Sequence, residues 1–220
     1  MRTIENACRR MGFVRVAGVD EVGRGCLAGP VMAGAVVLNP DRAIAGLRDS
    51  KMLSAQARDR LFDVIQSEAS AWSVAEVEPV EIDEVNIHQA SLQAMRKAVL
   101  ALDPLPDLVL VDAFRIPDLW MAQRRVIHGD RRCSSIAAAS IMAKVTRDRC
   151  MQRLHETDPR YGFDRHKGYA TADHLEAVAR FGYSPVHRRS FRPPSLFDVL
   201  EVADIGLRTD NALHSDESLE

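Results

Sequence analysis

Cysteine is scarce in this 220-residue sequence: the chain has four, without a CxxC pair or a nearby histidine pattern typical of zinc ligands. Such scattered cysteines argue against a zinc site or a disulfide framework and fit a reducing compartment. Long hydrophobic runs are also missing, since the longest, residues 27–38, is too short to span a bilayer, and the first residues lack the apolar centre of a signal peptide. We therefore expect a cytoplasmic protein without a membrane segment.

Neither sign of charge dominates the chain, whose formal net charge is −2, but the charges are unevenly distributed. Residues 113–170 contain twelve Lys or Arg against six Asp or Glu, whereas residues 198–220 contain seven acids and one base. A basic region suits phosphate-bearing partners, although a solvated helix face has the same composition. The apolar content of 46% allows a real core. We predict one domain over residues 1–197 and an acidic, disordered tail over residues 198–220.

Hydrophobic periodicity predicts an α/β chain. The predicted strands cover residues 13–19, 31–38, 72–77, 108–113 and 125–129, and the first two form a hairpin across a glycine-rich connection. The predicted helices cover residues 54–68, 87–102, 134–156 and 171–180. The small residues SSIAAAS at 134–140 indicate a helix that lies close against the sheet.

Four acidic residues lie at, or just beyond, the ends of predicted strands: Asp20, Glu21, Asp112 and Asp130. Ligands gather at the carboxyl ends of strands in open α/β sheets, so these acids are either helix caps and loop residues or a functional cluster. Carboxylates that converge on one edge repel each other, and a metal is the usual compensation. All-oxygen ligands favour Mg²⁺ or Mn²⁺, and a two-ion site suits displacement at phosphorus.

Asp148 is a competing ligand because it lies between two arginines. The predicted helix from Ser134 to Asp148 is roughly 21 Å long, at 1.5 Å per residue. One metal pair cannot reach both Asp130 and Asp148 across that length. We therefore interpret Asp148 as a member of an ion pair on the helix surface.

Asp20 and Glu21 are neighbours, and neighbours in a regular strand point to opposite faces. Both can bind one site only if the strand breaks its pleat there. Gly23 and Gly25 make such a break cheap and expose backbone N–H groups to a sugar or phosphate, although a GxG segment alone is more often a flexible hairpin loop.

The sequence resembles ribonuclease HII, the type 2 ribonucleases H, over about residues 13–192. The similarity rests on an ordered set of motifs: DEVGRG (20–25), AGPV (28–31), DSK (49–51), VNIHQASLQAM (85–95), LVDA (110–113), HGD (128–130), AAASIMAKVTRD (137–148), HKGYAT (166–171) and SPVHRRSF (184–191). The chain departs from the usual family pattern at three positions without losing an acidic residue: Cys26, Met52 and Ala113.

This resemblance implies an RNase H-like catalytic domain with a central mixed five-stranded sheet, flanking helices and a C-terminal helical region. It implies cleavage of the RNA strand of RNA–DNA hybrids, and cleavage 5′ of single ribonucleotides in duplex DNA to give 3′-hydroxyl and 5′-phosphate ends. The catalytic and metal-binding acids would be Asp20, Glu21, Asp112 and Asp130, with Mg²⁺ or Mn²⁺. We expect a monomer.

The resemblance also implies the substrate-binding residues. Backbone groups of Gly23, Arg24 and Gly25 would contact the ribose 2′-hydroxyl, and Tyr169 would pack on the neighbouring sugar. The implied contacts to the nucleic-acid backbone are Lys51, Arg188 and Arg189. Two alternatives remain: a protein that binds nucleic acid without cutting it, and a metal-dependent phosphatase for small nucleotides.

Overall fold

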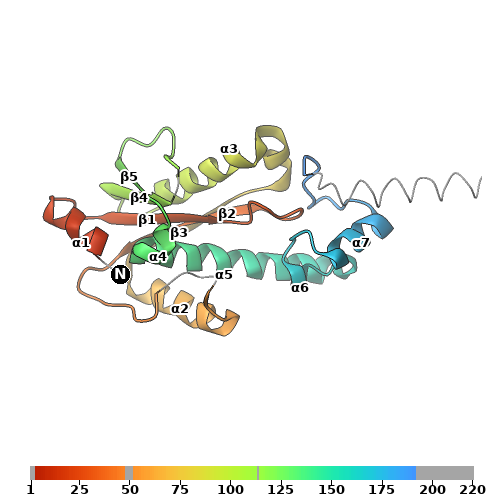
Figure 1. The fold of residues 1–220 in the computed structure, drawn as a ribbon, viewed down its shortest axis with the longest axis horizontal. Coiled ribbons are helices and arrows are strands. Elements are labelled where there is room, and N and C mark those ends of the chain that lie inside the picture. The colour runs from red at the N-terminus through yellow and green to blue at the C-terminus, as the bar shows by residue number, and fades with distance from the viewer. Residues whose placement is uncertain (1–2, 48–51, 113, 192–220) are drawn as a thin grey trace, which may run out of the picture.

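The structure is a computed structural model that describes residues 3–47, 52–112 and 114–191. A sheet with helices on both faces forms the body of the molecule (Figure 1). Its strands are β1 (Val16–Val22), β2 (Val31–Leu38), β3 (Ala69–Val77), β4 (Leu108–Asp112) and β5 (Ala122–Val126). The helical elements are α1 (Thr3–Arg10), α2 (Ala55–Glu68), α3 (Pro79–Leu100), α4 (Gly129–Arg132), α5 (Ser134–Thr157), the 3-10 turn η2 (Pro159–Tyr161), α6 (Phe163–His166) and α7 (Ala172–Phe181).

The sheet is mixed, with the strand order β3-β2-β1-β4-β5. β2 pairs antiparallel with both β1 and β3, whereas β4 runs parallel to β1 and β5 parallel to β4. The carboxyl ends of β1, β4 and β5 consequently meet at one edge of the sheet, where ligands gather in open α/β sheets. The predicted mixed five-stranded sheet is confirmed.

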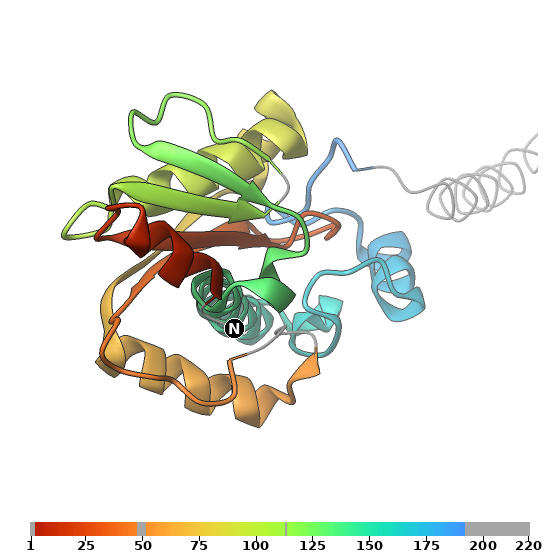
Figure 2. The ribbon, with the colours of Figure 1, turned by 60° about the vertical axis from the view of Figure 1, so that its left-hand side comes forward.

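The helices form layers on the two faces of the sheet. Figure 2 shows α3 on one face and α5 on the other, with α2 packed on the outside of α5. On the α3 face, Val19 of β1 packs in one buried cluster with Met95. On the opposite face, Val36 of β2 packs with Ile141 of α5 and Phe62 of α2. The site at the sheet edge therefore has a rigid layer on each side.

The start of α5 lies unusually close to the sheet. A Cβ added to Gly18 would lie 2.2 Å from the backbone nitrogen of Ile136, and one added to Gly34 would lie 2.4 Å from the carbonyl oxygen of Ala139. The predicted close packing of the small-residue stretch is therefore confirmed, and the two glycines of β1 and β2 complete it.

The C-terminal elements pack at the end of α5 that is farthest from α4 (Figure 1). Tyr161, Phe163 and Val178 form a buried cluster there with Met151 of α5. The helical C-terminal region is therefore confirmed. The predicted tail over residues 198–220 lies outside the described residues, as do Lys51 and Ala113.

Several predicted boundaries were wrong. β1 continues to Val22, and β5 ends at Val126, so that residues 129–132 form α4 instead of the end of a strand. The strand predicted at 125–129 overlaps β5 only at its end, because Arg124 and Arg125 in the middle of β5 are exposed and leave no apolar run to mark its start.

The predicted helix at 87–102 is the second part of a kinked α3. Asn86 has a φ of 68°, and its side chain accepts hydrogen bonds from the backbone nitrogens of His88 (3.0 Å) and Gln89 (3.2 Å). Asn86 therefore caps the second segment, and this is why the helical periodicity begins at the next residue. No helix in the described ranges is long and apolar enough to cross a membrane.

Candidate active site

Asp20 lies near the carboxyl end of β1, on the side of the sheet that faces α5. It pairs with Gly34 of β2, and Ser140 of α5 hydrogen-bonds its side chain. Burial raises the pKa of Asp20 well above its usual value, and the negative charges of Glu21 and Asp112 raise this pKa further. The carboxyl group is therefore held near two others in a poorly solvated place.

Glu21 follows in the same strand, and the expected break in the pleat at these two acids was wrong. β1 pairs with β2 without a register shift as far as Val22, and the backbone changes direction only at Gly23, whose φ is 91°. Glu21 is bonded by Arg24, whose Nη1 lies 3.2 Å from Oε1. Burial raises the pKa of Glu21, whereas Arg24 opposes this shift.

Asp112 is the last residue of β4 and completes the group at the sheet edge. The last paired residues of β1 and β4 are Val19 and Val111, so that Asp112 lies one step further along, beside the acids of β1. Its negative charge contributes to the raised pKa values of both Asp20 and Glu21. The structure therefore brings these three predicted acids within electrostatic reach of each other.

Asp130 lies in α4, directly after the left-handed residue His128 and Gly129. Its charge is not among the causes of the raised pKa of Asp20 or Glu21. Within the described part of the chain, no three acidic, histidine or cysteine side chains are arranged so that they could hold one ion as they stand. The placement of Asp130 in a shared site therefore stays a prediction.

The alternative of Asp130 as the cap of the long helix is not what the structure shows. α5 begins after Cys133, which makes no side-chain cap bond, and the backbone nitrogen of Ser135 donates instead to Glu5 Oε1 at 2.9 Å. Glu5 is fully buried and comes from α1, which the sequence patterns did not indicate.

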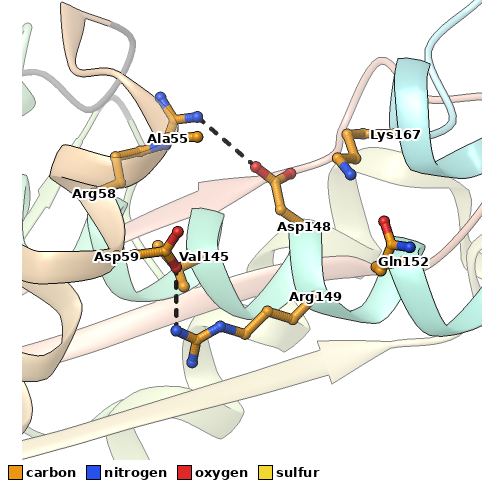
Figure 3. Close-up of a pocket in the computed structure, with 8 residues that line it drawn as sticks. All are labelled: Ala55, Arg58, Asp59, Val145, Asp148, Arg149, Gln152 and Lys167. Carbon is orange, nitrogen blue, oxygen red and sulfur yellow. Dashed lines mark hydrogen bonds and ion pairs between the residues drawn. The ribbon is translucent and has the colours of Figure 1, made fainter.

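Asp148 is confirmed as a member of an ion pair on the surface of α5. Its carboxylate lies 2.6 Å from Lys144 Nζ and 3.9 Å from an Arg58 nitrogen. Figure 3 shows the pair of Arg58 and Asp148 between α2 and α5, beside a second ion pair of Asp59 with Arg149 at 3.1 Å. The basic partners account for the acid at this position.

Residues 23–25, the GRG loop, follow the acids of β1 directly. A Cβ added to Gly23 would lie 2.3 Å from Arg147 Nε, so a side chain does not fit there. A Cβ added to Gly25 would meet nothing within 4 Å, so the backbone at this residue is open. Arg24 connects the loop to the site, through its bond with Glu21 and a contact of 5.4 Å with the Phe114 ring.

Two buried arginines hold the backbone of the GRG loop and of the residues that follow it. Arg147 is fully buried and donates to the carbonyl oxygens of Ala28 (3.0 Å), Pro30 (2.9 Å) and Lys167 (2.9 Å). The sequence analysis missed this role, because an arginine in a helix is usually solvated and its carbonyl partners are distant in the chain. The only available signal was its place in the motif at 137–148.

Arg188 is the second of these arginines, with an exposed fraction of 0%. Its Nε donates to Gly29 O and its Nη1 to Arg24 O, both at 3.0 Å. Burial lowers the pKa of Arg188 to about 10, so the guanidinium stays charged at neutral pH. Arg188 is thus buried against the backbone of the GRG loop, whereas its neighbour Arg189 is exposed.

Tyr169 lies next to the GRG loop and is 42% exposed. It forms an antiparallel bridge with Cys26, and burial together with the Cys26 thiol raises the pKa of its hydroxyl. The thiol of Cys26 is itself fully buried. Tyr169 therefore lies beside the residue that follows the GRG loop, whereas Lys51 lies outside the described residues.

The donor set at this edge fits a hard divalent cation. Its three carboxylates repel one another, and this repulsion contributes to the raised pKa values of Asp20 and Glu21. A bound cation would offset the repulsion. The oxygens of Asp20, Glu21 and Asp112 are the donors at this edge, although the three side chains are not arranged around one point as they stand, and neither sulfur nor imidazole is part of the set.

Comparison with known proteins identifies the family. The family model for ribonuclease HII matches residues 17–193. The chain belongs to the ribonuclease HII family. A ribonuclease HII from Methylibium petroleiphilum is 56% identical over 177 residues, which cover 80% of this chain and 89% of the relative. One from Solibacter usitatus is 51% identical over 191 residues, which cover 87% and 83%.

A solved structure supports the same assignment for the fold. The ribonuclease H2 from Pyrococcus horikoshii matches with a TM-score of 0.72 and 26% identity, over 87% of this chain and 99% of that one. Ribonucleases HII cleave the RNA of RNA–DNA hybrids and use divalent metal ions, so the chain is a metal-dependent nuclease.

Proposed function

We propose that the chain cuts the RNA strand of RNA–DNA hybrids and also cuts duplex DNA on the 5′ side of a single embedded ribonucleotide. The products would carry 3′-hydroxyl and 5′-phosphate ends. The main support is the position of the GRG loop, which begins two residues after Glu21 and is bonded to it by Arg24, so that a sugar held by the loop would lie near the carboxylates. Recognition of the sugar and cleavage of its phosphate would then take place in one site.

We further propose that Asp20, Glu21, Asp112 and Asp130 hold two divalent ions, Mg²⁺ or Mn²⁺. Such ions, when bound, supply the activation of the attacking water and the stabilisation of the leaving oxygen. The chain's own contribution is to fix the ligands: Ser140 orients Asp20, and Arg24 holds Glu21. The part of Asp130 rests on its place in the family motif.

Discrimination between RNA and DNA would come from the backbone of residues 23–25. The 2′-hydroxyl is the local group by which a protein separates the two, and the open backbone at Gly25 allows a sugar to approach. The bond from Arg188 to Arg24 O holds the loop in place, so Arg188 would act on substrate binding through the loop. The exposed Arg189, together with Lys51, would contact phosphates directly.

A duplex with one ribonucleotide tests this proposal, compared with the same duplex made only of DNA. With Mg²⁺ or Mn²⁺, we expect one cut 5′ of the ribonucleotide, no cut in the all-DNA duplex, and no activity after chelation. Mapping the product ends checks the chemistry. An intact protein that leaves the ribonucleotide duplex uncut, but binds it in a salt-sensitive manner, would support the binding protein without catalysis. Release of phosphate from free nucleotides would support the phosphatase.

A further inference from the structure

Three histidines form a buried cluster in the C-terminal region, away from the acids of the site. His166, His174 and His187 have exposed fractions of 9%, 0% and 2%. The rings of His166 and His174 are stacked, with centroids 4.3 Å apart and planes 13° from parallel. His174 Nε2 and His187 Nε2 are 3.0 Å apart. Buried polar groups of this kind need hydrogen-bond partners, and the partners here fix the state of each ring.

The direction of the hydrogen bonds follows from the backbone groups at the two ends of the chain of contacts. The backbone nitrogen of Ser184 lies 3.0 Å from His187 Nδ1 and can only donate, so His187 carries its hydrogen on Nε2. At the other end, Tyr169 O lies 2.9 Å from His174 Nδ1 and can only accept, so His174 carries its hydrogen on Nδ1. The Nε2 hydrogen of His187 then donates to His174 Nε2, and both rings are neutral.

Burial lowers the pKa of both His174 and His187 to about 4, which agrees with neutral rings at pH 7. With these two tautomers, each of the three hydrogen bonds has one donor and one acceptor. A continuous set of hydrogen bonds therefore runs from Ser184 through His187 and His174 to the backbone of Tyr169.

The same segment also holds the GRG loop. His187 forms a bridge with Ala28, and the next residue, Arg188, donates to the carbonyl oxygen of Arg24 at 3.0 Å. Residues 184–188 thus fix two elements that lie far apart in the sequence: the GRG loop through Arg188, and Tyr169 through the histidines.

We propose that Ser184, His187 and His174 form a positioning chain that fixes Tyr169 relative to the GRG loop. This rests on the proposed function, in which the loop contacts the ribose and Tyr169 packs on the neighbouring sugar. A fixed distance between the two would favour a junction between a ribonucleotide and a deoxyribonucleotide over a uniform hybrid. The positioning chain touches no substrate and acts through Tyr169.

The test compares cleavage of two substrates by the full chain: a duplex with one embedded ribonucleotide, and a uniform RNA–DNA hybrid. The readout is the ratio of the two kcat/KM values, because partial unfolding lowers both values equally and leaves their ratio unchanged. His174→Leu should lower this ratio roughly fivefold to tenfold, the factor expected for loss of one neutral hydrogen bond. His174→Asn should retain more of it, since the Asn amide can still donate to Tyr169 O.

A double-mutant cycle shows whether the histidine acts through the tyrosine. In a Tyr169→Ala background, we expect His174→Leu to lower the ratio no further. His155→Leu is the matched control, because His155 lies on α5 and pairs with Asp164 at 3.1 Å, outside the positioning chain, and its ratio should match the wild type.

Two results would overturn this inference and leave the proposed function intact. In the first, the wild type is active and His174→Leu has the same ratio of kcat/KM values. In the second, His174→Leu lowers the ratio as strongly in the Tyr169→Ala background as in the wild type. A folded wild type that cuts neither substrate would instead overturn the proposed function, and this inference with it.

Discussion

At the scale of single residues, the site is a place where like charges are held together. Asp20 and Glu21 share one strand, and Asp112 ends the neighbouring strand, so the charge of Asp112 helps to raise the pKa of both Asp20 and Glu21, and the charge of Glu21 raises the pKa of Asp20 further. Arg24 opposes this effect through its bond to Glu21, and Ser140 opposes it through its hydrogen bond with Asp20. Such an arrangement destabilises the empty fold and favours cation binding, which is the usual compromise between stability and activity at a functional site.

The two glycines of the GRG loop serve different purposes: Gly23 allows the fold and Gly25 allows the substrate to approach. Substituting each glycine separately tests this difference. Gly23→Ala should lower the free energy of unfolding by about 1–3 kcal/mol, because Gly23 has a positive φ and a Cβ would strike Arg147. Gly25→Ala should leave stability nearly unchanged, since nothing lies within 4 Å of its Cβ, while it lowers cleavage at a ribonucleotide. Urea unfolding and cleavage assays measure the two effects. Equal destabilisation by both substitutions would contradict this assignment.

At the scale of elements, α1 is more than an appendage to the sheet. Its Glu5 places a buried carboxylate at the N-terminus of α5, where the helix dipole favours negative charge. Glu5→Ala should therefore cost about 1–2 kcal/mol of unfolding free energy, and Glu5→Gln less, because the amide oxygen can still accept the bond. The control is Asp59→Ala, which removes an exposed ion pair with Arg149 and lies outside the first turn of its helix. If Glu5→Ala cost no more than the control in urea unfolding, the cap would have no energetic role.

The histidine cluster makes the stability of the C-terminal region depend on pH. The pKa of His174 and His187 is about 4 in the folded chain, lowered chiefly by burial, against an ordinary value of 6.5. Between pH 6.5 and pH 4, these two histidines bind protons in the unfolded chain but stay neutral in the folded chain. Stability should therefore fall as the pH drops from 6.5 to 4, by about 1.4 kcal/mol per pH unit for each such proton.

Unfolding in urea at several pH values measures this effect. His187→Gln should show a shallower decline than the wild type, because it removes one of the two buried rings. The same slope in both proteins would show that other groups govern the acid response.

At the scale of the whole molecule, the sequence predicted the parts whose signals are local. The apolar run of β2 marks its strand with the observed bounds, and Ser54 marks the start of α2 by its cap bond to Ala57. The positions of Asp20, Glu21 and Asp112 followed from strand ends, because parallel strands bring their carboxyl ends to one edge.

The parts that could not be predicted depend on contacts across the fold. Arg147 and Arg188 have the composition of surface residues, yet both are buried because distant carbonyl oxygens accept their hydrogens. Glu5 caps α5 through a bond from Ser135, which lies 130 positions later in the chain. Periodicity and local propensity contain no information on such partners.

Cleavage by Asp112→Asn most directly tests whether the carboxylates at the sheet edge perform the reaction. The wild type and the variant are given the same single-ribonucleotide duplex with Mn²⁺ or Mg²⁺, and binding is measured in parallel. Because the substitution keeps the shape of the side chain and removes its charge, we predict unchanged folding, largely retained binding, and a loss of cleavage of about 10³-fold or more. Cleavage by the variant at the wild-type rate would contradict the role of this edge as the active site.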